Sequence, residues 1–219
     1  MSAKHPIIAI TGSSGAGTTT VQNTFEAIFR REDLNAAVVE GDSFHRWNRK
    51  DCKDRMNDDE KLPGGHLSHF GPETNLFDEL EGLFRTYSEN GTGKRRYYLH
   101  NAEEAEPFGL EAGRFTPWAD ISRDTDLLFY EGLHGAVVSG DIDVAKYPDL
   151  IIGVVPVINL EWIQKINRDC RYRGYSLEAV TDVILRRMHD YVHYITPQFS
   201  RTHVNFQRVP IVDTSNPFV

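Results

Sequence analysis

Short apolar runs alternate with longer amphipathic or polar stretches along this chain. Runs rich in Ile, Val, Leu and Phe, without polar alternation, are typical of parallel strands that are covered on both faces. Parallel neighbours need crossover connections, usually helices, so the alternation predicts an α/β fold: a mostly parallel sheet covered by helices on both faces. The predicted strands are Ile7–Thr11, Ala36–Glu40, Asp126–Glu131, Asp149–Val155 and Val209–Asp213.

Three segments outside these runs have clear helical character. Thr19–Arg31 follows a glycine-rich loop, and Leu160–Arg171 follows the candidate N-cap Asn159. Leu177–Ile195 follows the candidate N-cap Ser176, and its apolar residues recur at helical spacing, which predicts a stripe facing the core. The stripe consists of Val180, Val183, Ile184, Met188, Tyr191 and Ile195.

Residues 44–125 differ from the rest of the chain. They are rich in Gly, Asn, Asp, His and aromatic residues; only Leu76–Tyr87 has clear helical periodicity, while Arg95–His100 resembles part of a hairpin. Long connections of this kind in compact domains are usually functional. We predict one domain over residues 1–219, with residues 44–125 as a long insertion between the second and third strands.

Composition narrows the classes of function. The chain has 219 residues, 40% hydrophobic and 26% charged, as in an ordinary soluble domain. No apolar run approaches the roughly 20 residues of a membrane span, and the N-terminus lacks signal-peptide features, which predicts a cytoplasmic protein without a membrane partner. The formal net charge of −8 argues against a nucleic-acid partner. Cys52 and Cys170 are expected to be free thiols.

The stretch ITGSSGAGTTT nearly matches the phosphate-binding pattern G-x-x-x-x-G-K-[ST], except that Thr18 stands where the lysine belongs. Glycines let backbone N–H groups converge on phosphate oxygens, the helix N-terminus adds positive charge, and Thr19 is placed to bind Mg²⁺. A glycine-rich turn that binds no nucleotide is the alternative. The predicted nucleotide-binding residues of this loop are Gly12, Ser13, Ser14, Gly15, Ala16, Gly17, Thr18 and Thr19.

Two carboxylates follow predicted strands at the edge where ligands bind in open α/β sheets. Asp42 lies just past the second strand, where it could take a proton from a substrate hydroxyl that attacks the γ-phosphate. The basic residues His45, Arg46 and Arg49 follow it and could grip an anionic substrate; a capping Asp with a solvated basic turn is the alternative. Glu131 ends the third strand like a Walker-B acid, placed to hold Mg²⁺.

Residues 159–175 carry a cluster of charges. Lys165 and Arg168 share a helix face beside Asp169, and further arginines, including Arg173, lie at the helix end. We predict a lid that closes over ATP and, together with Mg²⁺, supplies the positive charge that position 18 lacks. A solvated basic helix end is the alternative.

The remaining histidines carry less information. His66 and His69 have H-x-x-H spacing, but the sequence shows no third ligand, so no zinc site is predicted. His189 and His193 share a helix face, where packing or exposure is the expected role.

The strings TGSSGAGTTT, EGDSFHR, FYEGLHGAVV and GVVPVINLEWIQKINRD closely resemble the bacterial phosphoribulokinase family of P-loop kinases, and the resemblance runs from about His5 to the last residue. It implies that MgATP phosphorylates the C1 hydroxyl of D-ribulose 5-phosphate, a Calvin-cycle reaction. The bacterial branch also has threonine in place of the loop lysine, so Thr18 fits the resemblance.

The resemblance also implies residue roles. Asp42 matches the catalytic base, Asp169 a second acid, and Asp42, Glu131 and Thr19 the metal-binding residues. The remaining matches are Lys165 and Arg168 for catalysis, His45, Arg49, His100 and Lys165 for the sugar phosphate, and Arg168 and Arg173 for the nucleotide. Arg31 matches an allosteric surface through which NADH activates and AMP inhibits.

Members of that family continue well beyond the segment that matches residues 213–218 (DTSNPF), so this chain is expected to be C-terminally shortened. The resemblance also implies that the full-length form is a homo-oligomer. Two other functions stay open. One is a kinase of another small acceptor, uridine kinase-like, against which Thr18 counts. The other is a non-catalytic nucleotide sensor.

Overall fold

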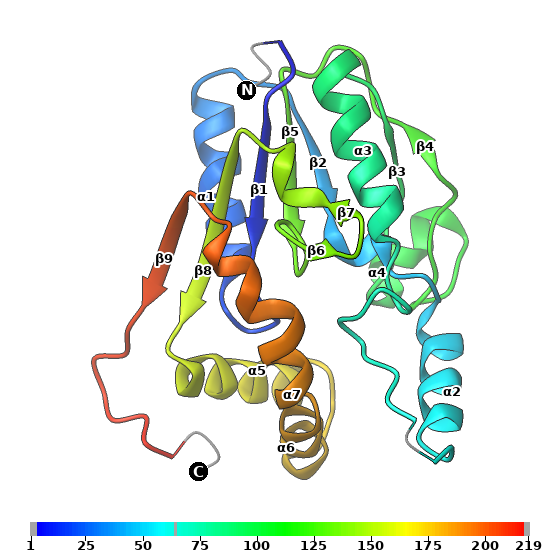
Figure 1. Cartoon of the computed structure of the whole chain (residues 1–219), viewed down its shortest axis with the longest axis vertical. Helices are drawn as coiled ribbons and strands as arrows, with labels where there is room; N and C mark the ends of the chain where they lie inside the picture. The colour runs from blue at the N-terminus through cyan, green and yellow to red at the C-terminus, as the bar shows by residue number, and fades with distance from the viewer. Residues whose placement is uncertain (1–3, 64, 217–219) are drawn as a thin grey trace.

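The computed structural model describes residues 4–63 and 65–216, and its centre is a five-stranded sheet in the order β2-β5-β1-β8-β9. Every neighbouring pair is parallel, and the strands point the same way, with their carboxyl ends toward α5 (Figure 1). The predicted parallel α/β sheet is therefore confirmed. The strands are β1 Ile7–Thr11, β2 Ala36–Glu40, β5 Leu127–Gly132, β8 Leu150–Pro156 and β9 Val204–Arg208.

Helices cover both faces of this sheet. Helix α1 (Thr18–Arg31) packs on one face, where Phe29 meets the ring of Phe129 edge-on. Helix α3 (Phe77–Asn90) packs on the other, where Phe84 meets Tyr130. Successive strand side chains point to opposite faces, so the unbroken apolar run of β5 fills two cores at once.

The chain between β2 and β5 holds several short elements besides α3. Helix α2 (Arg49–Asp59) was not predicted, because it buries none of its residues and so has no apolar stripe to reveal it. Asn48 caps it with a side-chain oxygen that accepts from Asp51 N at 2.9 Å. The other elements of this segment are η1 Gly41–Phe44, β3 Lys94–Arg95, α4 Ala102–Ala105, η2 Glu106–Phe108 and β4 Ala119–Asp120.

The predicted fifth strand, Val209–Asp213, is wrong. The strand that pairs with β8 is β9, immediately before it, and β9 has the polar sequence VNFQR. As the outermost strand of the sheet it needs no continuous apolar run, whereas Pro210 cannot donate a ladder hydrogen bond. Ile211 is fully exposed.

Two helix predictions also need correction. Helix α5 (Ile158–Tyr172) begins before Asn159, which is not its cap; the Asn159 side chain instead donates to the carbonyl of Thr214 at 2.7 Å. The predicted helix 177–195 is interrupted. Ser176 does cap its start, but α6 (Leu177–Arg186) is followed by α7 (Met188–Asp190) and the wider turn η4 (Tyr191–Ile195).

The remaining elements are small: β6 Val138–Ser139, β7 Ile142–Asp143, η3 Val144–Lys146 and η5 Thr196–Ser200. Cys52 and Cys170 are free thiols. Among the described residues, no helix is long and apolar enough to cross a membrane.

Candidate active site

The glycine-rich loop joins β1 to α1 at the carboxyl edge of the sheet (Figure 1). Its backbone passes twice through the left-handed region, with φ of 105° at Gly15 and 100° at Gly17, where glycine is favoured. The N-cap of α1 is Gly17, so no side chain caps the first N–H groups of the helix, which suits them to bind an anion. Thr19 lies exposed in the first turn of α1.

Side chains from distant segments are packed against this loop. A Cβ on Gly15 would lie 2.8 Å from the carbonyl oxygen of Glu161, so α5 rests directly on the loop. A Cβ on Gly17 would collide with the guanidinium of Arg208, at the end of β9. Arg208 donates to the carbonyl of Ala16 at 3.0 Å and to Gln164 Oε1 at 2.9 Å. A permanent cation therefore touches the loop that lacks the usual lysine.

Thr18 stands where the usual phosphate-binding loop has a lysine, and its side chain contacts a carboxyl group of the protein. Its hydroxyl hydrogen-bonds the carboxyl of Glu131, at the end of β5. Burial raises the pKa of Glu131 to about 7; the Thr18 hydrogen bond opposes this shift, and the charges of Asp42 and Glu40 add to it. A buried carboxyl poised to lose its proton near neutrality suits a site that receives a cation.

Asp42 follows β2 at the same sheet edge as the glycine-rich loop, and Gly132 links the two segments. Gly12 N donates to the carbonyl of Gly132 at 3.2 Å, and a Cβ on Gly132 would lie 2.7 Å from Gly41 Cα. Gly132 thus separates the loop from the residue that precedes Asp42. The register pairs Glu40 with Glu131, so all of these groups share one sheet edge.

Histidines surround the carboxylate of Asp42. His45 Nε2 lies 3.5 Å and His100 Nε2 3.7 Å from its oxygens, and Asn75 Oδ1 lies 2.8 Å from His45 Nδ1. Burial would raise the pKa of Asp42, but the His45 hydrogen bond and the charges of His45, His100 and His69 hold it well below its usual range. Asp42 is therefore ionised at neutral pH and able to accept a proton.

Arg49 is held at the same side of the site. Its guanidinium donates to the Tyr98 hydroxyl at 3.2 Å and to the carbonyl of His100 at 2.8 Å. Arg46, by contrast, donates to backbone carbonyls: to Glu73 O at 3.0 Å and to Asn75 O at 3.1 Å. Arg46 therefore fixes the local fold, while Arg49 and His100 form one wall around Asp42.

The carboxylate of Asp169 organises the cations of α5. Its oxygens lie 2.8 Å from Lys165 Nζ, 2.9 Å from Arg168 and 3.3 Å from Arg173 Nη1. The Asp169 side chain is only 7% exposed. Burial opposes ionisation, but the hydrogen bonds from Arg168 and Lys165 lower its pKa. Arg168 also donates to Ser14 Oγ at 2.8 Å, so this network reaches the glycine-rich loop.

Sequence reasoning missed Glu161, which is buried beneath the loop. The Ser13 hydroxyl donates to one of its oxygens, and the Tyr191 hydroxyl donates to the other at 3.3 Å. Burial raises the pKa of Glu161 to about 7. Its place in the first turn of α5 hid it, because an acidic residue there is an ordinary feature of a helix. Arg208 was missed because its strand was misplaced.

Arg31 lies apart from these residues. It is at the last turn of α1, whose 14 residues span roughly 20 Å from the loop, and its exposed side chain pairs with Glu32 at 2.8 Å. His69 does not pair with His66 either: its ring lies 4.8 Å from that of His45, the histidine beside Asp42.

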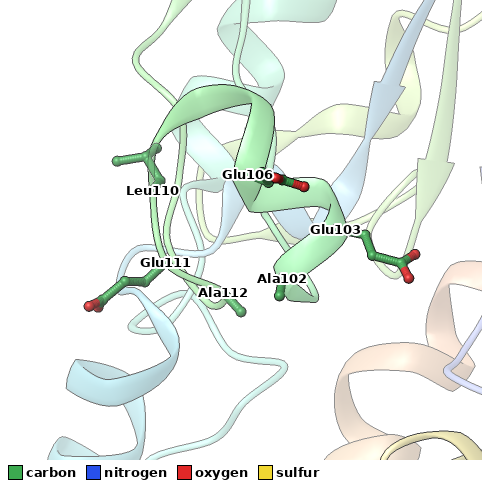
Figure 2. A pocket seen from close by; sticks show the side chains of 6 residues that line it. All are labelled: Ala102, Glu103, Glu106, Leu110, Glu111 and Ala112. Carbon is green, nitrogen blue, oxygen red and sulfur yellow. The ribbon is translucent and has the colours of Figure 1, made fainter.

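A shallow pocket at α4 and η2 contains none of the predicted site residues. Figure 2 shows its lining side chains, three of them carboxylates on a strongly curved segment. Such a lining repels an anionic substrate. The lining residues are Ala102, Glu103, Glu106, Leu110, Glu111 and Ala112.

Comparison with known proteins shows the family of the chain. The model of the "Phosphoribulokinase / Uridine kinase family" matches residues 7–215. The chain belongs to this family. The chromosomal phosphoribulokinase of Cupriavidus necator is 67% identical over 219 residues, which are 100% of this chain and 75% of that protein. The phosphoribulokinase of Nitrobacter vulgaris is 63% identical over 99% of this chain and 74% of its own length.

Solved structures of this kinase family share the fold. The phosphoribulokinase from Rhodobacter spheroides superposes with a TM-score of 0.85 at 56% identity, covering 99% of this chain and 74% of that one. A possible uridine kinase from Bacillus stearothermophilus has a TM-score of 0.53 at 18% identity, over 94% of this chain and 90% of that one, and shares the fold alone.

Proposed function

We propose that this protein is a phosphoribulokinase that transfers the γ-phosphoryl group of ATP to the C1 hydroxyl of D-ribulose 5-phosphate. The observation that carries the proposal is the meeting of three groups at one sheet edge: the glycine-rich loop, the cation network of α5 and the ionised carboxylate of Asp42. Identity of 67% to a named phosphoribulokinase supports the choice of acceptor.

In this mechanism the loop from Gly12 to Thr19 holds the phosphates through backbone N–H groups. Asp42 accepts the proton of the attacking hydroxyl, and His45 and His100 orient its carboxylate. Arg49, His100, His45 and Lys165 hold the sugar phosphate. Arg168 and Arg173 stabilise the charge on the transferring group, for which positioning and electrostatics are the main requirements.

The residues at this edge fit magnesium. Glu131, Asp42 and Thr19 offer the oxygen donors that Mg²⁺ prefers, and burial together with the charges of Asp42 and Glu40 raises the pKa of Glu131, a shift that a bound cation would oppose. When bound, Mg²⁺ neutralises charge on the phosphates. Arg208 and Arg168 add cations on the protein side, in place of the usual loop lysine.

The direct test is ATP-dependent turnover of a panel of acceptors, followed by ADP release. We expect D-ribulose 5-phosphate to be phosphorylated at C1, with kcat/KM at least 10²-fold above that of ribulose. Ribulose lacks the phosphate group that Arg49 and Lys165 are proposed to hold. Preference for uridine would favour the uridine kinase-like alternative. ATP binding without transfer to any acceptor would favour a nucleotide sensor.

The raised pKa of Glu131 predicts that Mg²⁺ binding releases a proton from this carboxyl group. Its pKa of about 7 means that Mg²⁺ must displace a proton at and below neutral pH, so apparent Mg²⁺ affinity should fall up to tenfold per pH unit below 7. Calorimetry of MgATP binding in buffers of different ionisation enthalpy measures this proton. Glu131→Gln should release about half a proton less at pH 7; equal release in both proteins would contradict the assignment.

Regulation and assembly extend the same proposal. Arg31, exposed and roughly 20 Å from the loop, is placed for an effector surface that responds to NADH and AMP, away from the chemistry. The outermost strand β9 exposes Val204 and Phe206, which suits a contact in a homo-oligomer. The reaction is proposed to take place in the cytoplasm.

A further inference from the structure

His66, His189 and Asp190 come together outside the active site. His66 follows α2, whereas the other two residues are in α7, more than a hundred positions later in the chain. His66 Nε2 lies 2.5 Å and His189 Nδ1 3.6 Å from the same oxygen, Asp190 Oδ1. The candidate ligand atoms all lie within 4.8 Å of one another.

We propose that these three residues form a site for a divalent transition-metal ion such as Zn²⁺. Two imidazoles and one carboxylate are a donor set for Zn²⁺, Co²⁺, Ni²⁺ or Fe²⁺, whereas Mg²⁺ prefers oxygen donors alone. The site is therefore chemically distinct from the magnesium site of the kinase reaction.

The geometry needs only side-chain rotations. Ligand atoms at about 2.1 Å around a tetrahedral ion lie about 3.4 Å apart, between the shortest and longest separations present here. The His66 and His189 side chains are 58% and 80% exposed, so little packing opposes a rotation of either ring, while that of Asp190 is only 5% exposed. Solvent has access for the remaining coordination position.

The buried carboxylate is held by its surroundings. The Ser68 hydroxyl hydrogen-bonds Asp190 and also accepts from Phe70 N at 3.1 Å. Such outer contacts orient a ligand and strengthen metal binding. Two arginines precede α7 in the chain. Arg186 is paired with Glu60 at 2.6 Å and with Asp182 at 2.9 Å. The charge of the half-buried Arg187 interacts with Asp190, so a bound metal ion must overcome the repulsion of this cation.

An ion at this position would tie the segment after α2 to α7. That segment continues through His69, which faces His45, to Asn75, which contacts His45 Nδ1. Metal binding is therefore expected to stiffen one wall of the active site as well as to raise stability, since it favours the folded state by mass action.

The test is Co²⁺ titration of the untagged protein in excess Mg²⁺, followed by visible absorption, with Zn²⁺ competition. We expect one tightly bound Co²⁺ with an intense tetrahedral-type spectrum. Zn²⁺ at 100 times its Kd should raise Tm by ~5–10 °C. His66→Ala and His189→Ala should each weaken binding at least tenfold and abolish the Tm shift, and both replaced side chains are exposed, so the fold is retained.

His193→Ala is the matched control, because His193 stacks on His189 at 6.2 Å but is not among the three ligands. It should bind Co²⁺ like the parent. Co²⁺ could instead bind to the histidines around Asp42, and the same titration of the Asp42→Asn variant tests this alternative. Binding that survives His66→Ala and His189→Ala, or that is lost in Asp42→Asn, overturns the proposal, and so does the absence of saturable Co²⁺ binding.

Discussion

Asp42→Asn should lower kcat by ~10²-fold or more, because the amide cannot accept the proton of the attacking sugar hydroxyl. The KM for ATP should rise by a smaller factor than kcat falls, because Asp42 is one of three proposed Mg²⁺ donors and the loop itself contacts Gly132 rather than the Asp42 side chain. Steady-state kinetics with ribulose 5-phosphate, by coupled ADP release, measures both parameters.

Asp58→Asn provides the control for this substitution. Asp58 makes an exposed ion pair with Lys61 on the outer turn of α2, and its loss should leave kcat within a factor of two. Because the pKa of Asp42 lies well below its usual range, the parent enzyme should show no loss of kcat from protonation of Asp42 between pH 6 and 8. A kcat unaffected by Asp42→Asn would remove Asp42 from the role of base.

Asp169→Asn should have the second large effect. Its carboxylate balances Lys165, Arg168 and Arg173, so the neutral amide leaves three cations together. Breaking a fully buried pair costs about 3–5 kcal/mol; since Arg173 is 46% exposed, we expect a smaller loss of about 2–3 kcal/mol in unfolding free energy. We expect kcat to fall by ~10²-fold because the displaced cations no longer meet the phosphates. Denaturant unfolding and turnover measure the two effects.

The same variant separates two roles for Asp169. If it anchors cations, the dependence of activity on Mg²⁺ concentration should stay that of the parent while the KM for ATP rises. If it is a metal ligand, half-saturation should move to higher Mg²⁺. The matched control is Asp182→Asn on α6. Asp182 pairs with Arg186 at the surface, so its replacement should change neither stability nor turnover measurably.

The apolar runs of the sequence were sufficient to place four strands of the sheet to within one residue at either end. Strands covered on both faces must be apolar throughout, so the local sequence pattern is enough to predict Leu127–Gly132 and Leu150–Pro156. Segments without that constraint were missed or misplaced. Helix α2 is polar on every side, and β9 lies at the sheet edge, so neither shows the apolar run or stripe of a buried element.

The chemistry divides in the same way. The sequence by itself determined the glycine-rich loop, the carboxylates after two parallel strands and the cations of α5, because strand direction and helix spacing place these groups at one edge. Only the tertiary structure decided which partners they have. Arg208 against Ala16, Glu161 beneath Ser13, and His66 beside Asp190 are contacts between segments far apart in the chain. No local pattern encodes such contacts, since they depend on how whole elements pack.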